Sequence, residues 1–353
     1  MLILYSICGL VLLILGADFL VKYCSNIASA LKIPPLVIGL TIVAFGTSAP
    51  ELAVGIKSSL DGSSSMVMGN VVGSNIFNVL FILGVAALIS PLVVTQQLVK
   101  FDTPLMVVLS IAVFLLAMDH KVSQIEGIVL VAALITYILF LLKQARKMKE
   151  ENTEDESEVQ FHWVKNITLT LVGLGLLVFG SELFIDNLVK VARSLNVSEE
   201  IIGLTLVAAG TSLPELVTSI MAVIKGQVDI AVGNVVGSNI FNLLGVLGLS
   251  CAVNSNGCDV TAAMVSFDIP LMIAVSVACL PIFFTGNRIN RVEGALFMSV
   301  YIAYTTYLIL LSSHHDSLKY FTTTLLYFFL PLVTLGISIS VFREIKSRKS
   351  NSV

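Results

Sequence analysis

The sequence of 353 residues has little charge, since only 12% of its residues are Asp, Glu, Lys or Arg. Soluble domains carry about 25% charged residues. The chain is also 56% hydrophobic and has a mean hydropathy of +0.97. The scarcity of charge therefore excludes an ordinary soluble domain and indicates an all-α integral membrane protein.

Other residue types are scarce or scattered. The five cysteines show neither metal-site spacing nor a paired framework, so we expect free thiols. No basic stripe alternates with aromatic residues, which excludes nucleic acid as a partner. Nothing in the sequence indicates a cofactor or a protein partner. The apolar N-terminus has no basic leader, and Asp18 and Lys22 stand where a cleavage site would be expected, so it predicts a transmembrane helix and not a signal peptide.

Long apolar runs are abundant. A helix that spans the bilayer needs about 20 mostly apolar residues. By this measure the sequence predicts eleven spans, near residues 2–22, 34–58, 66–90, 103–118, 124–143, 166–190, 200–224, 229–253, 265–284, 291–312 and 320–342. Only one connection is long, residues 144–164, and we expect a charged cytoplasmic linker there.

The distribution of basic residues predicts the orientation in the lipid bilayer. With the N-terminus outside, 15 of the 20 Lys and Arg residues fall on the inner side. This agrees with the excess of positive charge found in cytoplasmic loops. We therefore expect a multi-pass protein of the plasma (inner) membrane with a cytoplasmic C-terminus.

An internal repeat organises the chain. Residues 39–52 read GLTIVAFGTSAPEL and residues 203–216 read GLTLVAAGTSLPEL, identical at 11 of 14 positions. Residues 69–78 and 233–242 both read GNVVGSNIFN, and both pairs of segments are offset by 164 residues. Duplication of this kind is the main evidence for two related halves.

Each half contains five predicted spans, an odd number, so the second half enters the membrane from the opposite side. The sequence thus predicts ten helices as two inverted five-helix repeats, residues 1–143 and 165–312. An eleventh helix and a basic tail fill residues 313–353. Inverted repeats of this type place a binding site near the midplane, at the interface of the halves.

The first repeated motif brings a carboxylate into an apolar helix. Burying the carboxylate of Glu51 in a membrane helix costs free energy, and the chain repeats this costly placement in its second half. Pro50 has no N–H, so the carbonyl of Gly46 loses its helical partner. Thr47 and Ser48 precede Glu51 by four and three residues, which places their oxygens near one face. The second half supplies the same types of residue: Gly210, Thr211, Ser212, Pro214 and Glu215.

The second repeated motif is a polar stripe. Asn70, Ser74 and Asn78 recur at intervals of four residues, and Gly69 and Gly73 form a G-x-x-x-G step that permits close helix contact. The second half repeats the stripe with Gly233, Asn234, Gly237, Ser238 and Asn242. We expect Asn70 and Asn234 to hydrogen-bond between helices and not to touch ions.

These motifs contain only oxygen ligands. Hard oxygen donors suit hard cations, and Ca²⁺ takes six to eight of them. Two carboxylates balance one Ca²⁺ or two monovalent ions. No histidine or cysteine joins the set, which disfavours a soft transition metal.

The two motif pairs resemble the alpha repeats of the cation/calcium exchanger superfamily, most closely its prokaryotic sodium/calcium exchanger branch, over residues 1–312. The resemblance implies that Ca²⁺ and Na⁺ are exchanged by alternating access. It implies ligand roles for Thr47, Ser48, Glu51, Ser74, Asn78, Thr211, Ser212, Glu215, Ser238 and Asn242, and for the backbone carbonyls of Ala44 and Ala208. Some relatives have aspartate where this chain has Asn78 or Asn242. Two carboxylates instead of three leave the ion stoichiometry and the involvement of K⁺ open.

Other functions remain to be weighed. A Ca²⁺/H⁺ or K⁺-dependent exchanger would use the same site, and a passive cation channel is the alternative from another class. An enzyme is disfavoured, because no nucleophile, metal-binding histidine or phosphate-binding loop accompanies the glutamates. The first and sixth helices are candidates for a sliding gate.

Four of the acidic residues outside the two motifs lie in or beside predicted spans. Asp102 and Asp268 each stand two residues before a proline, and we expect them to be helix N-caps. We expect Asp18 and Glu182 to lie at the membrane interface.

Overall fold

A computed structural model describes residues 1–151, 162–195, 202, 208–284, 286–336, 338, 339 and 342. Within this part, nine helices are long and apolar enough to cross a membrane, or ten if one bent pair counts as a single span. The prediction of an all-helical, multi-span membrane protein is therefore confirmed. Residues 203–207 of the predicted span 200–224 lie outside the described part, so the count of eleven stays a prediction.

The first half of the chain is a series of helices joined by short loops. Its elements are α1 (Leu2–Leu31), α2 (Pro35–Ile38), η1 (Gly39–Val43), α3 (Ala44–Thr47), α4 (Ala49–Leu60), α5 (Ser65–Phe77), η2 (Asn78–Ile82), α6 (Leu83–Ile89), β1 (Leu92–Val93), η3 (Leu98–Asp102), α7 (Thr103–Leu116), η4 (Ala117–Asp119), β2 (Lys121–Val122) and α8 (Gln124–Glu151).

The second half has a similar order. Its elements are α9 (Trp163–Ser194), α11 (Ala208–Gly210), α12 (Leu213–Ile224), α13 (Val228–Phe241), η6 (Asn242–Val246), α14 (Leu247–Ala252), β3 (Cys258–Asp259), η7 (Met264–Asp268), α15 (Ile269–Phe284), β4 (Arg288–Ile289), α16 (Arg291–Ser312), α17 (Leu318–Thr324) and η8 (Leu325–Phe329). The predicted linker 144–164 is helical at both ends, and its residues 152–161 lie outside the described part.

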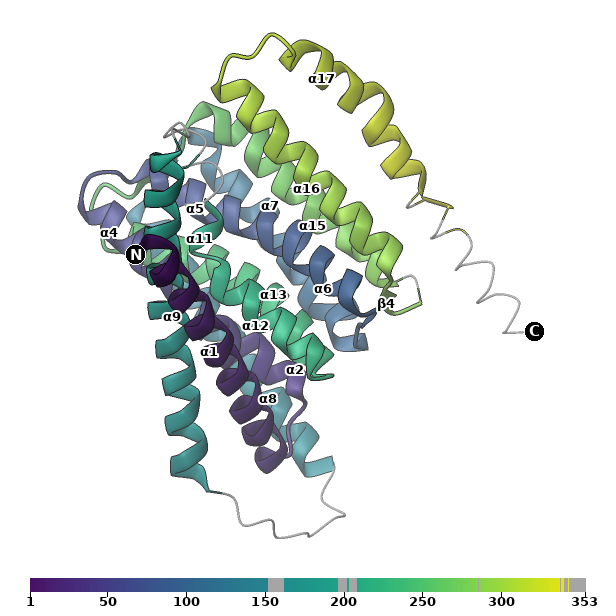
Figure 1. Ribbon diagram of the computed structural model, residues 1–353. Coiled ribbons are helices and arrows are strands. Elements are labelled where there is room, and N and C mark those ends of the chain that lie inside the picture. Colours follow the sequence, from purple (N-terminus) through teal and green to yellow (C-terminus); the bar gives the residue numbers. More distant parts are fainter. Residues whose placement is uncertain are drawn as a thin grey trace.

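The two polar stripes occupy the centre of the bundle. The span Val228–Ala252 has 89% of its most apolar window buried, and the span Ser65–Ile89 has 72%. By contrast, the span Leu318–Gly336 has none of its window buried and lies at the outer margin, beyond α16 (Figure 1). Polar residues at the centre and apolar residues outside are what a bilayer requires of a polar site.

The helix that carries Glu51 is broken, as the sequence predicts. The segments Pro35–Thr47 and Ala49–Leu60 meet at an angle of 45°. Ser48 lies between them with φ −82° and ψ 10°, and Pro50 stands in the first turn of α4. Ser212 repeats this geometry before α12, with φ −89° and ψ 10°. Each break therefore places a glutamate in the first turn of a short helix.

Two small strand pairs join the halves of the chain. β1 pairs antiparallel with β4, where Leu92 lies opposite Ile289. β2 pairs antiparallel with β3, where Val122 lies opposite Cys258. The sequence did not predict these strands, because each has two residues and forms only against a loop far away in the chain.

Helices α1 and α9 pack along each other on one flank of the bundle (Figure 1). Glycines form this contact: a Cβ on Gly9 would lie 2.8 Å from the carbonyl oxygen of Gly180, and one on Gly16 would lie 2.7 Å from that of Gly173. Small residues let two helix backbones approach closely in a membrane.

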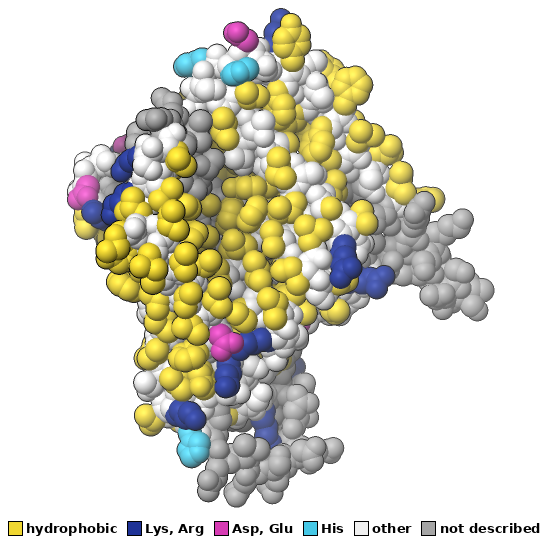
Figure 2. Space-filling view, in the orientation of Figure 1, with side chains coloured by type: hydrophobic (Ala, Val, Ile, Leu, Met, Phe, Trp, Pro, Cys, Tyr) yellow, Lys and Arg dark blue, Asp and Glu magenta, His cyan; other side chains and the backbone are white. Residues whose placement is uncertain are grey.

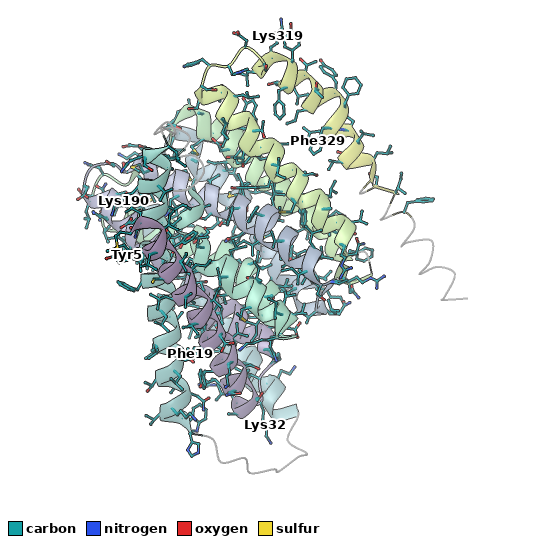
Figure 3. The ribbon with its side chains drawn as sticks, in the orientation of Figure 1. Tyr5, Phe19, Lys32, Lys190, Lys319 and Phe329 are labelled. Atoms are coloured by element: carbon teal, nitrogen blue, oxygen red, sulfur yellow. The ribbon has the colours of Figure 1, made fainter. Side chains whose placement is uncertain are left out.

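The molecular surface has the polarity of a membrane protein. Hydrophobic side chains cover the middle of the face in Figure 2, whereas most of the Lys, Arg, Asp, Glu and His side chains visible there lie toward its ends. Lys32 and Lys319 lie near opposite ends of the molecule (Figure 3). The five cysteines are free, as expected.

The prediction that Asp102 and Asp268 are N-caps is wrong. Neither residue starts a helix, because η3 continues into α7 and η7 continues into α15. Each carboxylate instead accepts a hydrogen bond from a tyrosine, Tyr137 to Asp102 and Tyr304 to Asp268, both at 3.0 Å. A buried carboxylate without a free helix end needs another donor.

Candidate functional site

Glu51 and Glu215 come from the two halves of the chain and lie buried at the centre. Glu51, in α4, is 1% exposed, and Glu215, in α12, is fully buried. Both glutamates lie in the first turn of a helix, where the positive end of the helix dipole stabilises a negative charge.

Serines from the opposite half hold these carboxylates. The hydroxyl of Ser48 donates to Oε1 of Glu215 at 2.8 Å, and the hydroxyl of Ser212 donates to Oε1 of Glu51 at 2.9 Å. Ser212 also lies 3.1 Å from the hydroxyl of Ser74. The sequence placed Ser48 beside its own Glu51, but the broken helices turn each serine toward the other half.

Several oxygens at this centre have no hydrogen-bond partner among the described residues. They are Oε2 of Glu51, Oε2 of Glu215, Oδ1 of Asn78, Oδ1 of Asn242 and Oγ of Ser238. A buried polar atom without a partner is destabilising by about 1–3 kcal/mol. Two carboxylate oxygens, two amide oxygens and a hydroxyl left unpaired in one region fit the donor set of a hard cation.

Asn70 and Asn234 form hydrogen bonds between helices, as expected, whereas the expectation that they do not touch ions stays a prediction. The amide of Asn70 donates to the backbone carbonyl of Glu51 at 3.1 Å. The amide of Asn234 donates to the carbonyl of Glu215 at 3.4 Å and to Ser219 at 3.0 Å. Each asparagine therefore supports the backbone that carries its glutamate.

The other predicted ligands also lie in this region. Thr47 is fully buried, and its hydroxyl contacts Oδ1 of Asn234 at 3.1 Å and the carbonyls of Val43 and Ala44 at 3.1 and 3.4 Å. The carbonyl of Ala44 therefore faces Thr47. Thr211 is half-buried in the turn between α11 and α12. Ala208 begins α11, and its side chain lies outside the described part.

Sequence reasoning missed two residues, Asn75 and Asn239. Both lie in the repeated GNVVGSNIFN segments, and both are buried. The amide of Asn78 donates to Oδ1 of Asn239 at 3.0 Å, and that of Asn242 donates to Oδ1 of Asn75 at 3.2 Å. Their identity in both copies was the available signal, but they lie off the stripe of four-residue spacing.

The repeated glycines differ in what the structure shows of them. A Cβ on Gly233 would lie 3.0 Å from the carbonyl of Leu36, and one on Gly237 would lie 2.8 Å from the Cα of Leu40. These two glycines thus allow α13 to pack against the bent helix. A Cβ on Gly69 would lie 3.4 Å from the Cε of Met264, and one on Gly73 would meet nothing within 4 Å among the described residues, so close helix contact at these two glycines stays a prediction.

The sequence matches a known group of transporters. The sodium/calcium exchanger protein family matches residues 1–143 and 165–310. The chain belongs to this family. The members of the family with a known role are transporters and not enzymes. In them Na⁺ and Ca²⁺ are the transported ions and not cofactors.

The relatives named here align with this chain over most of their length. The sodium/calcium exchanger MaX1 of Methanosarcina acetivorans is 35% identical, over 84% of this chain and 95% of its own. The inner membrane protein YrbG of Escherichia coli is 35% identical, over 78% and 86%. A structure of the sodium-calcium exchanger NCX_Mj, soaked with Na⁺ and Ca²⁺, has a TM-score of 0.74 at 30% identity and covers 88% of this chain. This chain is therefore a multi-pass membrane protein.

Proposed function

We propose that this chain is a secondary active antiporter that exchanges Ca²⁺ for Na⁺ across the plasma membrane by alternating access. The observation that carries the proposal is the pair of buried glutamates. Each has one oxygen bonded to a serine of the other half and one oxygen left unpaired. Ions would bind at this midplane site between the halves.

The proposed ligands supply oxygen only. They are the side chains of Thr47, Ser48, Glu51, Ser74, Asn78, Thr211, Ser212, Glu215, Ser238 and Asn242 and the backbone carbonyls of Ala44 and Ala208. Two carboxylates give a charge of about −2, which one Ca²⁺ or two Na⁺ would neutralise. Because both ions need Glu51 and Glu215, binding of one expels the other, which is the basis of exchange.

Alternating access needs one part of the protein to move against another. The repeat offset of 164 residues and the odd number of predicted spans per half favour an inverted repeat. Helices α1 and α9 contact each other through Gly16 and Gly173, so they would slide as one unit over the core. The eleventh helix lies outside the repeat and has no part in this mechanism.

The proposed orientation puts the N-terminus outside and the C-terminus in the cytoplasm. Lys32 and Lys190 lie toward opposite ends of the bundle in Figure 3, as the assignment of Lys32 to the inner side and Lys190 to the outer side requires. The inner side then holds 15 of the 20 basic residues. The proposed division is a first half 1–143, a linker 144–164, a second half 165–312 and an extra helix and tail 313–353.

Two alternatives share parts of this site. Coupling to K⁺ would add an ion to the exchange, and its test is whether K⁺ in the transport buffer changes the rate. A passive cation channel would conduct without a counter-ion. The unpaired carboxylate oxygens favour tight binding of a fixed number of ions in each transport cycle, which is a property of an exchanger.

The experiment is uptake of ⁴⁵Ca²⁺ into proteoliposomes loaded with Na⁺ and diluted into Na⁺-free or Na⁺-matched buffer at fixed pH. We expect uptake by the wild type only with an outward Na⁺ gradient, and background uptake by Glu51→Gln. Glu182→Gln, an exposed glutamate in α9, is the matched control and should retain activity. Uptake that ignores Na⁺ and follows a pH gradient would overturn the proposed coupling.

A further inference from the structure

Four asparagines form a ring between the two copies of GNVVGSNIFN. Asn75 is 2% exposed, and Asn78, Asn239 and Asn242 are fully buried. Only Asn78 and Asn242 have a proposed ligand role. An asparagine side chain has an oxygen end and an NH₂ end of nearly equal size, so a buried asparagine can bind a cation only if its oxygen end faces the ion.

The orientation of Asn75 follows from its neighbours. Its NH₂ group lies 3.3 Å from the backbone carbonyl of Asn239 and 3.7 Å from the sulfur of Met272. A carbonyl oxygen and a thioether can only accept hydrogen bonds. The NH₂ end of Asn75 must therefore face them, and its Oδ1 is left to accept from elsewhere.

The orientation of Asn242 follows from that of Asn75. Oδ1 of Asn75 accepts a hydrogen bond from the NH₂ group of Asn242 at 3.2 Å. The NH₂ end of Asn242 is thus held by Asn75, and its Oδ1 stays buried with no partner among the described residues. A flipped amide would present N–H groups to a cation and would oppose its binding.

The second half repeats the arrangement with the roles exchanged. The NH₂ group of Asn239 lies 3.3 Å from the carbonyl of Asn75 and 3.5 Å from the sulfur of Met106. Oδ1 of Asn239 accepts from the NH₂ group of Asn78 at 3.0 Å. Oδ1 of Asn78 is likewise buried without a partner in the described part.

We propose that Asn75 and Asn239 are positioning residues that orient the amide oxygens of Asn242 and Asn78 toward the transported cation. The inference rests on the proposed function and extends it. Each half of the chain thereby orients a ligand of the other half. Asn75 and Asn239 touch no ion themselves. They act through the hydrogen bonds that fix which end of each ligand amide faces the site.

The test is a double-mutant cycle on the full-length protein, read by equilibrium ⁴⁵Ca²⁺ binding in detergent and by Na⁺-driven uptake in proteoliposomes. Asn75→Ala should raise the half-saturating Ca²⁺ concentration about tenfold, because the amide of Asn242 is no longer held in one orientation. In the Asn242→Asp background the same change should have less than about a threefold effect, because both carboxylate oxygens can face the ion.

The symmetry of the ring supplies the control. Asn78→Asp should leave the effect of Asn75→Ala unchanged, because Asn78 is oriented by Asn239. Conversely, the effect of Asn239→Ala should be suppressed by Asn78→Asp and not by Asn242→Asp. A role in packing alone cannot produce this crossed pattern of rescue. Asn75→Ser and Asn239→Ser, which keep a polar group but cannot reach the ligand amide, replace the alanine variants if those do not fold.

Equal effects of Asn75→Ala or Asn75→Ser in the two backgrounds would overturn the inference and leave the proposed function standing. Absence of Na⁺-dependent Ca²⁺ uptake by the wild type would instead overturn the proposed function, and the inference with it. The two failures are distinguishable because the first is a comparison of variants and the second concerns the unmodified chain.

Discussion

The hydroxyl of Ser48 donates a hydrogen bond of 2.8 Å to Glu215, a residue 167 positions further along the chain. Ser212 does the same for Glu51 at 2.9 Å. Neither half of the chain thus contains a complete carboxylate site, since the serine next to each glutamate serves the other one. A movement that separates the halves would change both glutamates together.

This exchange of partners predicts the effect of removing one serine hydroxyl. Ser48→Ala leaves Oε1 of Glu215 without its donor and removes a proposed ligand. Hydrogen bonds to charged groups contribute about 1.5–3 kcal/mol, so the half-saturating Ca²⁺ concentration should rise about tenfold or more. Ca²⁺ titration of Na⁺-driven uptake measures this.

The control for the serine variants is Ser110→Ala. Ser110 is also buried, but its hydroxyl donates to the carbonyl of Met106 in its own helix. It should leave the Ca²⁺ dependence unchanged. An equal loss in Ser48→Ala and Ser110→Ala would show that the effect is general destabilisation.

Breaking the buried hydrogen bond between Asp102 and Tyr137 should lower the stability of the protein and leave the proposed ion ligands in place. Tyr137→Phe removes the donor to a fully buried carboxylate and should lower the free energy of unfolding by about 1–3 kcal/mol. Thermal unfolding of the purified protein in detergent measures the effect. Replacing both partners, Tyr137→Phe with Asp102→Asn, should restore part of it. A double variant less stable than Tyr137→Phe would contradict this account.

The contact of α1 with α9 predicts a steric effect. Gly16→Val would bring a side chain against the backbone of Gly173, where a Cβ alone would already be at 2.7 Å. Overpacking of this kind costs about 1–3 kcal/mol, so both the transport rate and the melting temperature should fall. Gly175→Val is the matched control on α9, because a Cβ there would meet no atom of another described element within 4 Å. Full activity of Gly16→Val would show that α1 and α9 need not stay in close contact.

An ion pair connects α1 to the end of α12. Nζ of Lys225 lies 2.6 Å from Asp18, and their side chains are 26% and 39% exposed. Asp18 was expected at the membrane interface, and the structure places it within α1, bonded to another helix. Partly exposed pairs contribute about 1 kcal/mol at most, so Asp18→Asn should change the exchange rate by less than about fivefold.

The charge-swapped variant, Asp18→Lys with Lys225→Asp, tests whether the pair itself matters. It should return the rate toward that of the wild type, whereas each single charge reversal should be slower. Rates measured at low and high salt separate the contribution of the ion pair from that of packing, because salt screens exposed charges. A charge-swapped variant as slow as the single reversals would contradict a role for the pair.

Composition and duplication alone were enough to predict much of this protein. Apolar runs of bilayer length indicated a helical membrane protein, and Glu51 and Glu215 stood out because a buried charge in a membrane helix is costly. Residues spaced by three or four positions share a helix face, so the polar stripes could also be recognised. These features depend on local chain geometry, which sequence spacing expresses directly.

Only the tertiary structure decided which groups meet across the bundle. The partners of Ser48, Asn75 and Asp102 lie 35 or more positions away, and no spacing rule relates them. Asp102 was taken for a helix cap because a proline follows, but η3 runs directly into α7, which contains that proline. Packing brings Tyr137 to Asp102 and the two GNVVGSNIFN copies together, and this packing depends on the shape of the whole helix bundle.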